Sequence, residues 1–352
     1  MKSNLSRLLV LAGLILVGAL YFTSRGPQKP VLHVYIWSDY LAEGLIEEFA
    51  AAYDCQVIVD NYDSNEVLHA KLKGGATGYD VVFPSSYMVR MMAADGLLRK
   101  INHANIPNSK NIDPIFLGNV SIDRKMVYSI PYMTGATGIA YQRDEVKDFE
   151  PSWRMFERAD LAGRMTLLDD HREVLGAALK VLGHSLNSTD ETAIEAAADL
   201  VIKWKQNIAQ FASEANKAGV ASKEFYLVQA WGGDIQQIID ENGDENLAFA
   251  LPVEGFPMWE DTAAIPTGAD NVDLAEKFIN FLHDPVVAAR NTEFNSYLCP
   301  NWLSYNNLDE AVLRNPIVMI PPELLKKGEQ IEDVGPHLAK YTAAWDRVKS
   351  AR

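Results

Sequence analysis

The sequence predicts an α/β fold in two lobes, and two observations support this prediction. Short apolar, β-rich segments alternate with longer helical patterns from residue 31 onwards, which favours parallel βαβ units. The length of 352 residues also suits two domains of ordinary size, each with its own core. Because 48% of the residues are hydrophobic, disordered and collagen-like architectures are excluded.

The first lobe begins with an alternation of strands and helices. Strands are predicted at Val31–Ile36, Gln56–Asn61 and Asp80–Phe83, and helices at Leu41–Tyr53, Val67–Lys73 and Tyr87–Ala94. An extended segment that opens with small residues, Gly135–Tyr141, is expected to cross to the second lobe.

The second lobe is predicted to repeat this alternation. Strands are expected at Met165–Leu168, Leu227–Trp231 and Leu247–Leu251, and helices at Glu173–Leu182 and Thr192–Ile208, with Thr189 as a helix N-cap. A strand at Trp259–Pro266 runs back, a helix follows at Leu274–Leu282, and the tail is mostly helical. We therefore expect lobe 1 to comprise residues 31–140 and 262–305, and lobe 2 residues 141–261 and 306–352.

The first 30 residues have the features of an export signal. Lys2 and Arg7 precede Leu8–Phe22, a run of fifteen residues without charge or proline. This run is short for a membrane span, which needs about 20 apolar residues. We expect export to the periplasm, and the sequence leaves open whether the segment is cleaved or retained as an anchor, the only part expected to contact a membrane.

The charge of the remaining chain excludes one class of partner. The chain has 32 basic and 47 acidic residues; four of the basic ones and none of the acidic ones lie in residues 1–30, so residues 31–352 carry a net charge of −19. A protein with this negative net charge repels nucleic acid, because binding to phosphates needs a basic surface. The partner is expected to be positive or neutral.

Aromatic and acidic side chains collect just after the predicted strands, where ligand sites of α/β sheets lie. Three tryptophans each have an acid within three residues, in the pairs Trp37 with Asp39, Trp231 with Asp234, and Trp259 with Asp261. Carboxylates in a closed cleft need cations, and an aromatic face adds roughly 0.5–2 kcal/mol of cation–π attraction. Several such pairs along one groove predict a flexible molecule with amines at intervals, which describes an aliphatic polyamine.

Seven segments of the chain form a recognisable set: YIWSDY (35–40), YDSNEVLHAKL (62–72), YDVVFPSSY (79–87), IPYMTGATGI (130–139), LDDHREV (168–174), WGGD (231–234) and WEDTAAIP (259–266). With these segments in this order, the chain from about residue 31 onwards resembles the periplasmic spermidine/putrescine-binding proteins of ABC importers. The resemblance implies a type II periplasmic binding protein, in which two lobes of mostly parallel sheet and helices are joined by a hinge and close over a polyamine.

The resemblance also implies roles for individual residues. The aromatic walls would be Trp37, Tyr40, Tyr87, Trp231, Trp259 and Tyr297. The ammonium groups would be bound by Asp170, Glu173 and Asp261, with Ser38 and Ser85 as hydrogen-bond partners. Asp39 and Asp234 resemble the putrescine-preferring branch, whereas Tyr87, Asp170 and Trp259 resemble the spermidine-preferring branch.

Two features bear on selectivity among polyamines. A glutamine near the end of spermidine-type members has no clear counterpart, since either Gln330 or Ile331 could occupy its place. The five acids Asp39, Asp170, Glu173, Asp234 and Asp261 exceed what a diamine needs and repel one another when the site is empty. We therefore expect a spermidine-like triamine as the ligand, with putrescine next.

Enzyme and metal functions have little support in the sequence. No HExxH, GxSxG or GxxxxGK[ST] motif occurs, and we expect no cofactor and no metal site. An enzyme with the same two-lobed fold would use Asp170 and Glu173 as its acid and base. We do not expect this protein to be an enzyme. The sequence leaves open whether the partner that recognises the ligand-bound protein is an ABC permease or the periplasmic domain of a membrane sensor. It also leaves open whether Cys55 and Cys299 form a disulfide bond. We expect a monomer.

Overall fold

The computed structural model describes residues 29–119 and 123–351, so the predicted signal or anchor lies almost wholly outside the described residues. The elements of the first part of the chain are β1 (Val31–Ile36), α2 (Leu45–Ala52), β2 (Gln56–Asn61), α3 (Asn65–Lys73), β3 (Val81–Val82), α4 (Ser86–Ala94), the 3₁₀ helix η1 (Pro107–Asn111), α5 (Pro114–Asn119) and β4 (Ser129–Gln142). Within the described residues, no helix is both long and apolar enough to cross a membrane.

The second part of the chain continues the alternation of strands and helices. Its elements are η2 (Trp153–Glu157), η3 (Ala159–Leu161), β5 (Met165–Leu167), α6 (His171–Val181), α7 (Glu191–Lys205), β6 (Ile208–Phe211), α8 (Glu214–Ala221), β7 (Leu227–Trp231), α9 (Gly232–Asn242), β8 (Leu247–Ala250), β9 (Phe256–Ala264), α10 (Val272–Leu282), α11 (Pro285–Asn295), η4 (Ser304–Asn307), α12 (Glu310–Leu313), α13 (Pro322–Leu325), β10 (Gly328–Gln330), η5 (Gly335–His337) and α14 (Leu338–Ser350).

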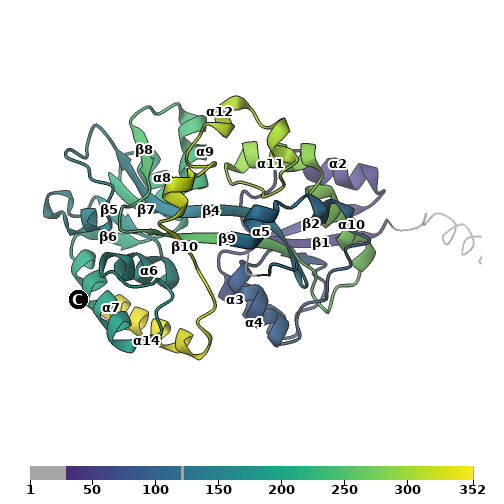
Figure 1. The fold of residues 1–352 in the computed structure, drawn as a ribbon, viewed down its shortest axis with the longest axis horizontal. Helices are drawn as coiled ribbons and strands as arrows, with labels where there is room; N and C mark the ends of the chain where they lie inside the picture. Colours follow the sequence, from purple (N-terminus) through teal and green to yellow (C-terminus); the bar gives the residue numbers. More distant parts are fainter. Residues whose placement is uncertain (1–28, 120–122, 352) are drawn as a thin grey trace, which may run out of the picture.

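The predicted two-lobed α/β fold is confirmed. In the first lobe β1 pairs in parallel with β2 and β3, and in the second lobe β5 pairs in parallel with β6 and β7. Figure 1 shows helices packed around each group of strands, with β4 and β9 running from one lobe to the other. Parallel strands with helical connections on their faces are the arrangement expected of βαβ units.

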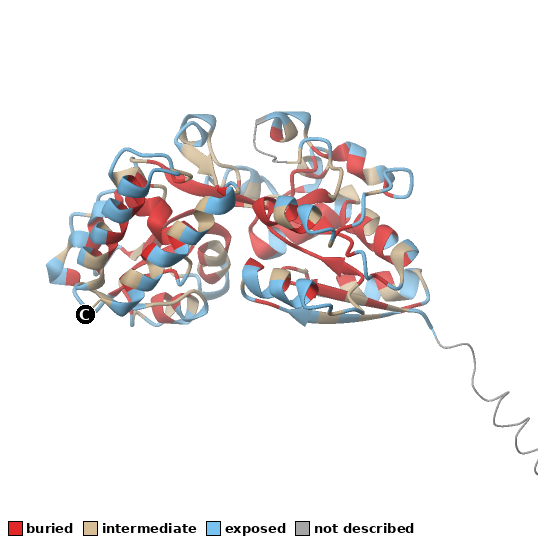
Figure 2. Cartoon of the chain, turned by 90° about the horizontal axis from the view of Figure 1, so that it is seen from below, coloured by how far each residue is buried: buried red, intermediate tan, exposed pale blue. Residues whose placement is uncertain are grey.

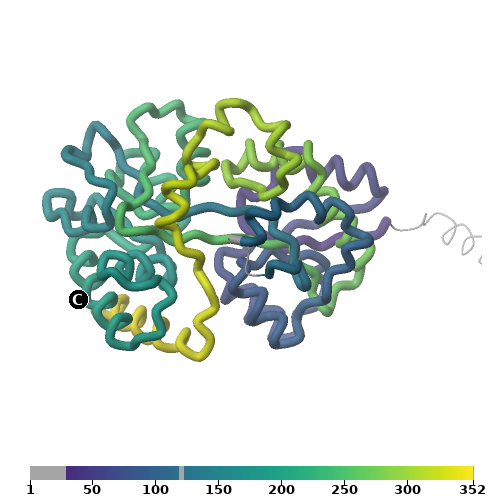
Figure 3. Tube along the Cα trace, viewed as in Figure 1, coloured from purple at the N-terminus to yellow at the C-terminus, as the bar shows by residue number. Residues whose placement is uncertain are grey.

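The two crossing strands join the lobes into one hydrogen-bonded sheet. The strand order is β2-β1-β3-β9-β4-β7-β5-β6, with β10 beside β9 and β8 beside β4. β4 and β9 are antiparallel, and their register places Gly135 opposite Trp259 and Met133 opposite Asp261. The chain crosses a further time in the stretch that leads to α14, as the tube in Figure 3 shows.

Each lobe has its own hydrophobic core. One core is built from β1, β3, α10 and neighbouring segments, and includes Phe49, Phe83 and Phe278. The other is built from α6, α7, α14 and their strands, and includes Trp153 and Trp204. In Figure 2 the buried residues form two masses that are connected along the crossing strands. The lobes can therefore keep their internal packing while the crossings between them bend.

Several element predictions need correction. The helix predicted at Thr192–Ile208 ends at Lys205, and Ile208 begins the edge strand β6. Its N-cap is Asp190 rather than Thr189, because the Asp190 carboxylate accepts the hydrogen bond of the Thr192 N–H. α8, α9, α11 and β10 were not predicted individually.

Cys55 and Cys299 are both buried and both free, so the two thiols are not bonded to each other.

Candidate ligand-binding site

A cavity of about 540 Å³ lies between the lobes, and we call it the interlobe cavity. Twelve of the thirteen predicted site residues line it: Trp37, Ser38, Tyr40, Ser85, Tyr87, Asp170, Glu173, Trp231, Asp234, Trp259, Asp261 and Tyr297. Most of them come from β1, β3 and β9 and the segments after them, or from β5, β7 and the segments after these strands, and Tyr297 follows α11. The expectation that ligand-binding residues gather at strand ends thus brought together residues as far apart in sequence as Trp37 and Asp261, and the family resemblance added Tyr297.

Strand β9 supplies an aromatic ring and a carboxylate to the same side of the cavity. Trp259 and Asp261 are two residues apart, so both side chains project from one face of the strand. Trp259 packs edge-on against Tyr297, with ring centroids 4.9 Å apart. Gly135 lies opposite in β4, where a Cβ would come within 2.6 Å of the Trp259 ring. A glycine at this position leaves the indole room to line the cavity.

Asp261 is held by two hydroxyl donors and is nearly inaccessible to solvent. Ser85 donates to its Oδ1 at 2.6 Å and Tyr40 donates to its Oδ2 at 2.8 Å. Asn65 donates to Ser85 Oγ, which fixes the serine in place. Burial raises the pKa of Asp261 to about 6 despite these two donors. Within the described residues the carboxylate has no salt bridge, so it keeps its capacity for a bound cation.

Glu173 lies in the first turn of α6 and is 3% exposed. Trp231 Nε1 donates to its Oε1 at 3.1 Å, while Oε2 has no hydrogen-bond partner of normal geometry in the described part of the chain. Burial, and then the charge of Asp170, raise the pKa of Glu173 to about 8. Buried carboxyl oxygens without partners are costly, and a bound cation would satisfy this one.

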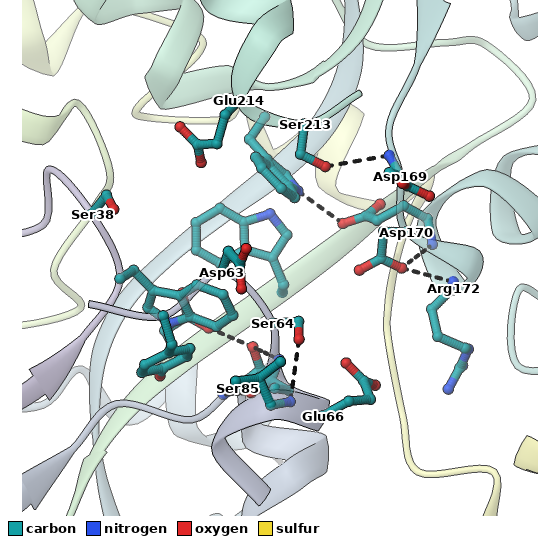
Figure 4. Close-up of a pocket in the computed structure, with 18 of the residues that line it drawn as sticks. Ser38, Asp63, Ser64, Glu66, Ser85, Asp169, Asp170, Arg172, Ser213 and Glu214 are labelled. Carbon is teal, nitrogen blue, oxygen red and sulfur yellow. Dashed lines mark hydrogen bonds between the residues drawn. The ribbon is translucent and has the colours of Figure 1, made fainter. Parts of the chain in front are cut away.

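Asp170 has a structural role as well as a place on the cavity wall. Its carboxylate caps α6 by accepting from the N–H groups of Arg172 at 2.8 Å and Glu173 at 3.1 Å. Figure 4 shows Asp170 across the cavity from Glu66, a residue of α3 in the other lobe. Carboxylates from both lobes therefore face one another, and a polyvalent cation between them would relieve their repulsion.

Asp234 and Asp39 meet a lysine that the sequence did not suggest. Tyr297 donates to Asp234 Oδ1 at 2.7 Å, and Lys217 Nζ lies 3.3 Å from Asp234 Oδ2 and 3.6 Å from Asp39 Oδ2. Asp39 is the one predicted site residue that does not line the cavity: its side chain is 64% exposed and its backbone is left-handed, with φ of 56°. This geometry directs its carboxylate to Lys217 at the cavity rim.

Some lining residues were missed by sequence reasoning. Tyr62, Asn65 and Glu66 follow β2 directly, so the strand-end rule could have found them. Lys217 lies on α8, which follows a strand that the sequence did not reveal, and no signal pointed to it. At the uncertain position near the C-terminus, Ile331 lines the cavity and Gln330 does not. Asp169 also lines the cavity, and its carboxylate forms a salt bridge with Lys349.

The lining is strongly acidic and rich in aromatic rings. Eight carboxyl side chains line the cavity, against the cationic side chains of Lys217 and Arg172. Arg172 donates instead to Asn187 and to the Glu332 carbonyl. Within the described residues, no group of three or more His, Cys, Asp or Glu side chains is arranged to hold a metal ion. An acidic, ring-lined cavity between two hinged α/β lobes defines a solute-binding protein for small cations.

Comparison with known proteins agrees with this class. Residues 44–319 match the family model described as bacterial extracellular solute-binding protein. The chain belongs to this family, which binds solutes outside the cytoplasm. It is 34% identical to the spermidine/putrescine-binding periplasmic protein of Escherichia coli, over 99% of each chain. It is 31% identical to a putrescine-binding periplasmic protein of the same organism, over 97% of this chain and 98% of that one.

A solved structure agrees with the fold. The chain is similar to the spermidine/putrescine ABC transporter substrate-binding protein of Streptococcus pneumoniae, with a TM-score of 0.78 and 32% identity. The similarity covers 91% of this chain and 98% of that one. The comparisons give no support to an enzyme on this frame or to a sensor-coupled role.

Proposed function

We propose that this protein captures a polyamine in the interlobe cavity and delivers it to an ABC permease, without catalysing a reaction. The relatives it resembles are named for spermidine and putrescine binding, and the lining chemistry agrees with such ligands. Ammonium groups would pair with the carboxylates, and the methylene segments between them would lie against the aromatic rings. The thirteen residues predicted from the sequence, with Asp39 at the rim, are the proposed contacts.

One observation carries the proposal. Glu173 and Asp261 are buried, at 3% and 5% exposure, and neither has a salt bridge within the described residues. Burying a carboxylate without a cation costs several kcal/mol, which a protein sustains where a ligand supplies the missing charge. Asp261 is held by Tyr40 and Ser85 of the first lobe, whereas Glu173 lies on α6 of the second lobe. One extended molecule with several ammonium groups therefore suits the two carboxylates better than a monovalent ion.

We further propose a triamine of the spermidine type as the preferred ligand, with putrescine next. Six carboxylates on the cavity wall have no salt bridge among the described residues: Asp63, Glu66, Asp170, Glu173, Glu214 and Asp261. A triamine would supply a counterion to more of them than a diamine would. Leaving a partly buried charge unpaired lowers the affinity.

Ligand binding is proposed to close the lobes about the crossing strands. Lobe 1 would comprise residues 31–140 and 262–305, and lobe 2 residues 141–261 and 306–352. Because carboxylates of both lobes face the cavity, a polyvalent cation would attract both and favour the closed form. The protein is proposed to act as a monomer in the periplasm, exported by its first 30 residues, which are either cleaved or retained as an anchor.

The direct test is titration calorimetry of the purified protein with putrescine, spermidine, norspermidine and spermine. The proposal expects saturable one-to-one binding, tightest for a triamine. Absence of binding to all four amines would refute it. Delivery to a permease is tested separately, by measuring whether deletion of the gene abolishes spermidine uptake by intact cells; unchanged uptake would contradict that part of the proposal.

A further inference from the structure

Lys217 is a cationic side chain in a cavity otherwise suited to cations. It extends from α8 of the second lobe and is 22% exposed. Its Nζ lies within salt-bridge distance of Asp234, at 3.3 Å in the same lobe, and of Asp39, at 3.6 Å in the first lobe. The ammonium group therefore bridges the two lobes at one place in the cavity.

The lysine resembles the end of a polyamine chemically. Both are primary ammonium groups on a chain of methylenes. Burial lowers the pKa of Lys217, but Asp234, Glu214 and Asp39 together raise it above its ordinary value, so the group is charged at neutral pH. A second ammonium group placed beside it would be repelled.

The carboxylates of the cavity consequently fall into two sets. Asp234 has both oxygens engaged by the protein, Oδ1 with Tyr297 and Oδ2 with Lys217. Glu173 and Asp261 have no such cation within the described residues. The first set is neutralised by the chain itself and the second set remains for a ligand.

We propose that Lys217 is a tethered ammonium group that occupies the cation position at Asp234 and Asp39, and thereby limits the number of ammonium groups that a ligand can place in the cavity. The proposal rests on the proposed function and deepens it, since it names the residue that discriminates against longer polyamines. Spermine, a tetraamine, is longer than spermidine and carries one more ammonium group, so repulsion by Lys217 would weaken its binding more. Lys217 is a specificity-determining residue in this account.

The test compares the dissociation constants of spermine and spermidine by calorimetry for the full chain and for Lys217→Met, which keeps the methylene stem and removes the charge. Freed of the lysine, Asp234 and Asp39 become available to a fourth ammonium group. The affinity for spermine relative to spermidine should rise by about tenfold or more, on the scale of one charge pair. Lys217→Arg, which keeps the charge, should preserve the preference of the unchanged protein.

The matched control is Lys223→Met. Lys223 lies two residues after the end of α8 and pairs with Asp144 on the outside of the protein, so its removal should leave the ratio unchanged. Lys217→Gln repeats the test with a polar replacement in case the methionine variant does not fold, and thermal unfolding of each variant reports folding.

The outcomes separate the two proposals. If the unchanged protein binds none of the amines, the proposed function fails and this inference fails with it. If the unchanged protein binds spermidine but the Lys217→Met and Lys217→Gln variants keep its spermine-to-spermidine ratio within about twofold, the inference alone is overturned. A uniform loss of affinity for both amines in these variants would also overturn it, because it would make Lys217 a structural support.

Discussion

Glu173 and Asp261 concentrate the electrostatic cost of the empty cavity in two side chains. Each is buried, and burial raises the pKa of each above its ordinary value. Two hydroxyl donors support Asp261 and one indole N–H supports Glu173, but neutral donors compensate a carboxylate only in part. A bound ammonium group would complete the compensation, which is why these residues are central to ligand affinity.

The first prediction concerns Asp261→Asn. The amide keeps the size of the side chain but removes the charge, so the affinity for spermidine should fall by about 2 kcal/mol or more, the scale of losing one partner of a buried charged pair. Calorimetry measures the change. Asp240→Asn, at an exposed carboxylate of α9 that does not line the cavity, is the control and should bind as the unchanged protein does. Equal affinities for all three proteins would remove Asp261 from the site.

The second prediction is a pH dependence of binding. With a pKa of about 8 in the empty cavity, Glu173 is mostly protonated at neutral pH. A bound ammonium group favours the carboxylate and lowers this pKa, so binding releases a proton. By linkage the affinity rises with pH up to about pH 8 and falls as the solution is acidified, with a further loss below the Asp261 pKa of about 6.

Calorimetry at pH 6.5 in buffers of different ionisation enthalpy measures that release. The amines of the ligand stay protonated there, since alkyl ammonium groups titrate near pH 10. The expected signal is net proton release in the unchanged protein and less of it in Glu173→Gln. A binding enthalpy independent of buffer, together with an affinity that does not change between pH 5.5 and 8, would contradict this account.

At the scale of elements, α6 combines a helix cap and a binding surface in the same residue. Asp170 caps the helix through the backbone N–H groups of Arg172 and Glu173. Asp170→Ser should keep the cap and lose the charge, so that stability stays near that of the unchanged protein while spermidine binding weakens. Asp170→Ala should lose both, with stability lower by about 1 kcal/mol. Urea unfolding and calorimetry measure the two effects.

Asp190→Ala provides the control for this separation. Asp190 caps α7 through the Thr192 N–H and lies away from the cavity, so its loss should lower stability and leave binding unchanged. If Asp170→Ser binds spermidine as tightly as the unchanged protein, Asp170 is a helix cap alone.

The sequence predicts the elements with strong apolar patterns and misses those without them. β1 and β2 match the predicted ranges because each contains apolar and β-branched residues in close succession. β6 was absorbed into the preceding helix because its four residues are partly exposed and only Ile208 continued the helical pattern. α9 was missed because Gly232 and Gly233 indicate a loop. A glycine is needed at position 233 because a Cβ there would lie 2.4 Å from the Tyr297 ring.

The candidate site was predictable to the extent that its residues lie in recognised strands or directly after them. Trp37 follows the first predicted strand, Trp259 and Asp261 lie in the predicted crossing strand, and all three line the cavity. Lys217 was not predictable, since it lies on a short helix after the unrecognised β6, and a lone lysine carries no pattern. Asp39 is an acid at a position where the sequence predicts a site residue, but its left-handed backbone directs its carboxylate to the rim of the cavity. Local conformation of this kind is set by packing that the sequence does not reveal.

At the scale of the whole molecule, two cores and shared crossing strands allow the lobes to move as units. The largest hydrophobic core of each lobe is separate, with Phe278 in one and Trp204 in the other, and β4 and β9 connect the two lobes. Closure over a polyvalent cation should make the molecule more compact. Small-angle scattering with and without saturating spermidine should record a smaller radius of gyration in the bound form, and identical curves would contradict hinge closure.

The most direct test of the central claim is a crystal structure of the protein with spermidine. The account predicts a single extended ligand in the interlobe cavity, with ammonium groups within hydrogen-bond distance of Asp261 and Glu173 and methylenes against Trp259. It would be contradicted by a ligand bound elsewhere, or by ammonium groups that leave both carboxylates without a cation.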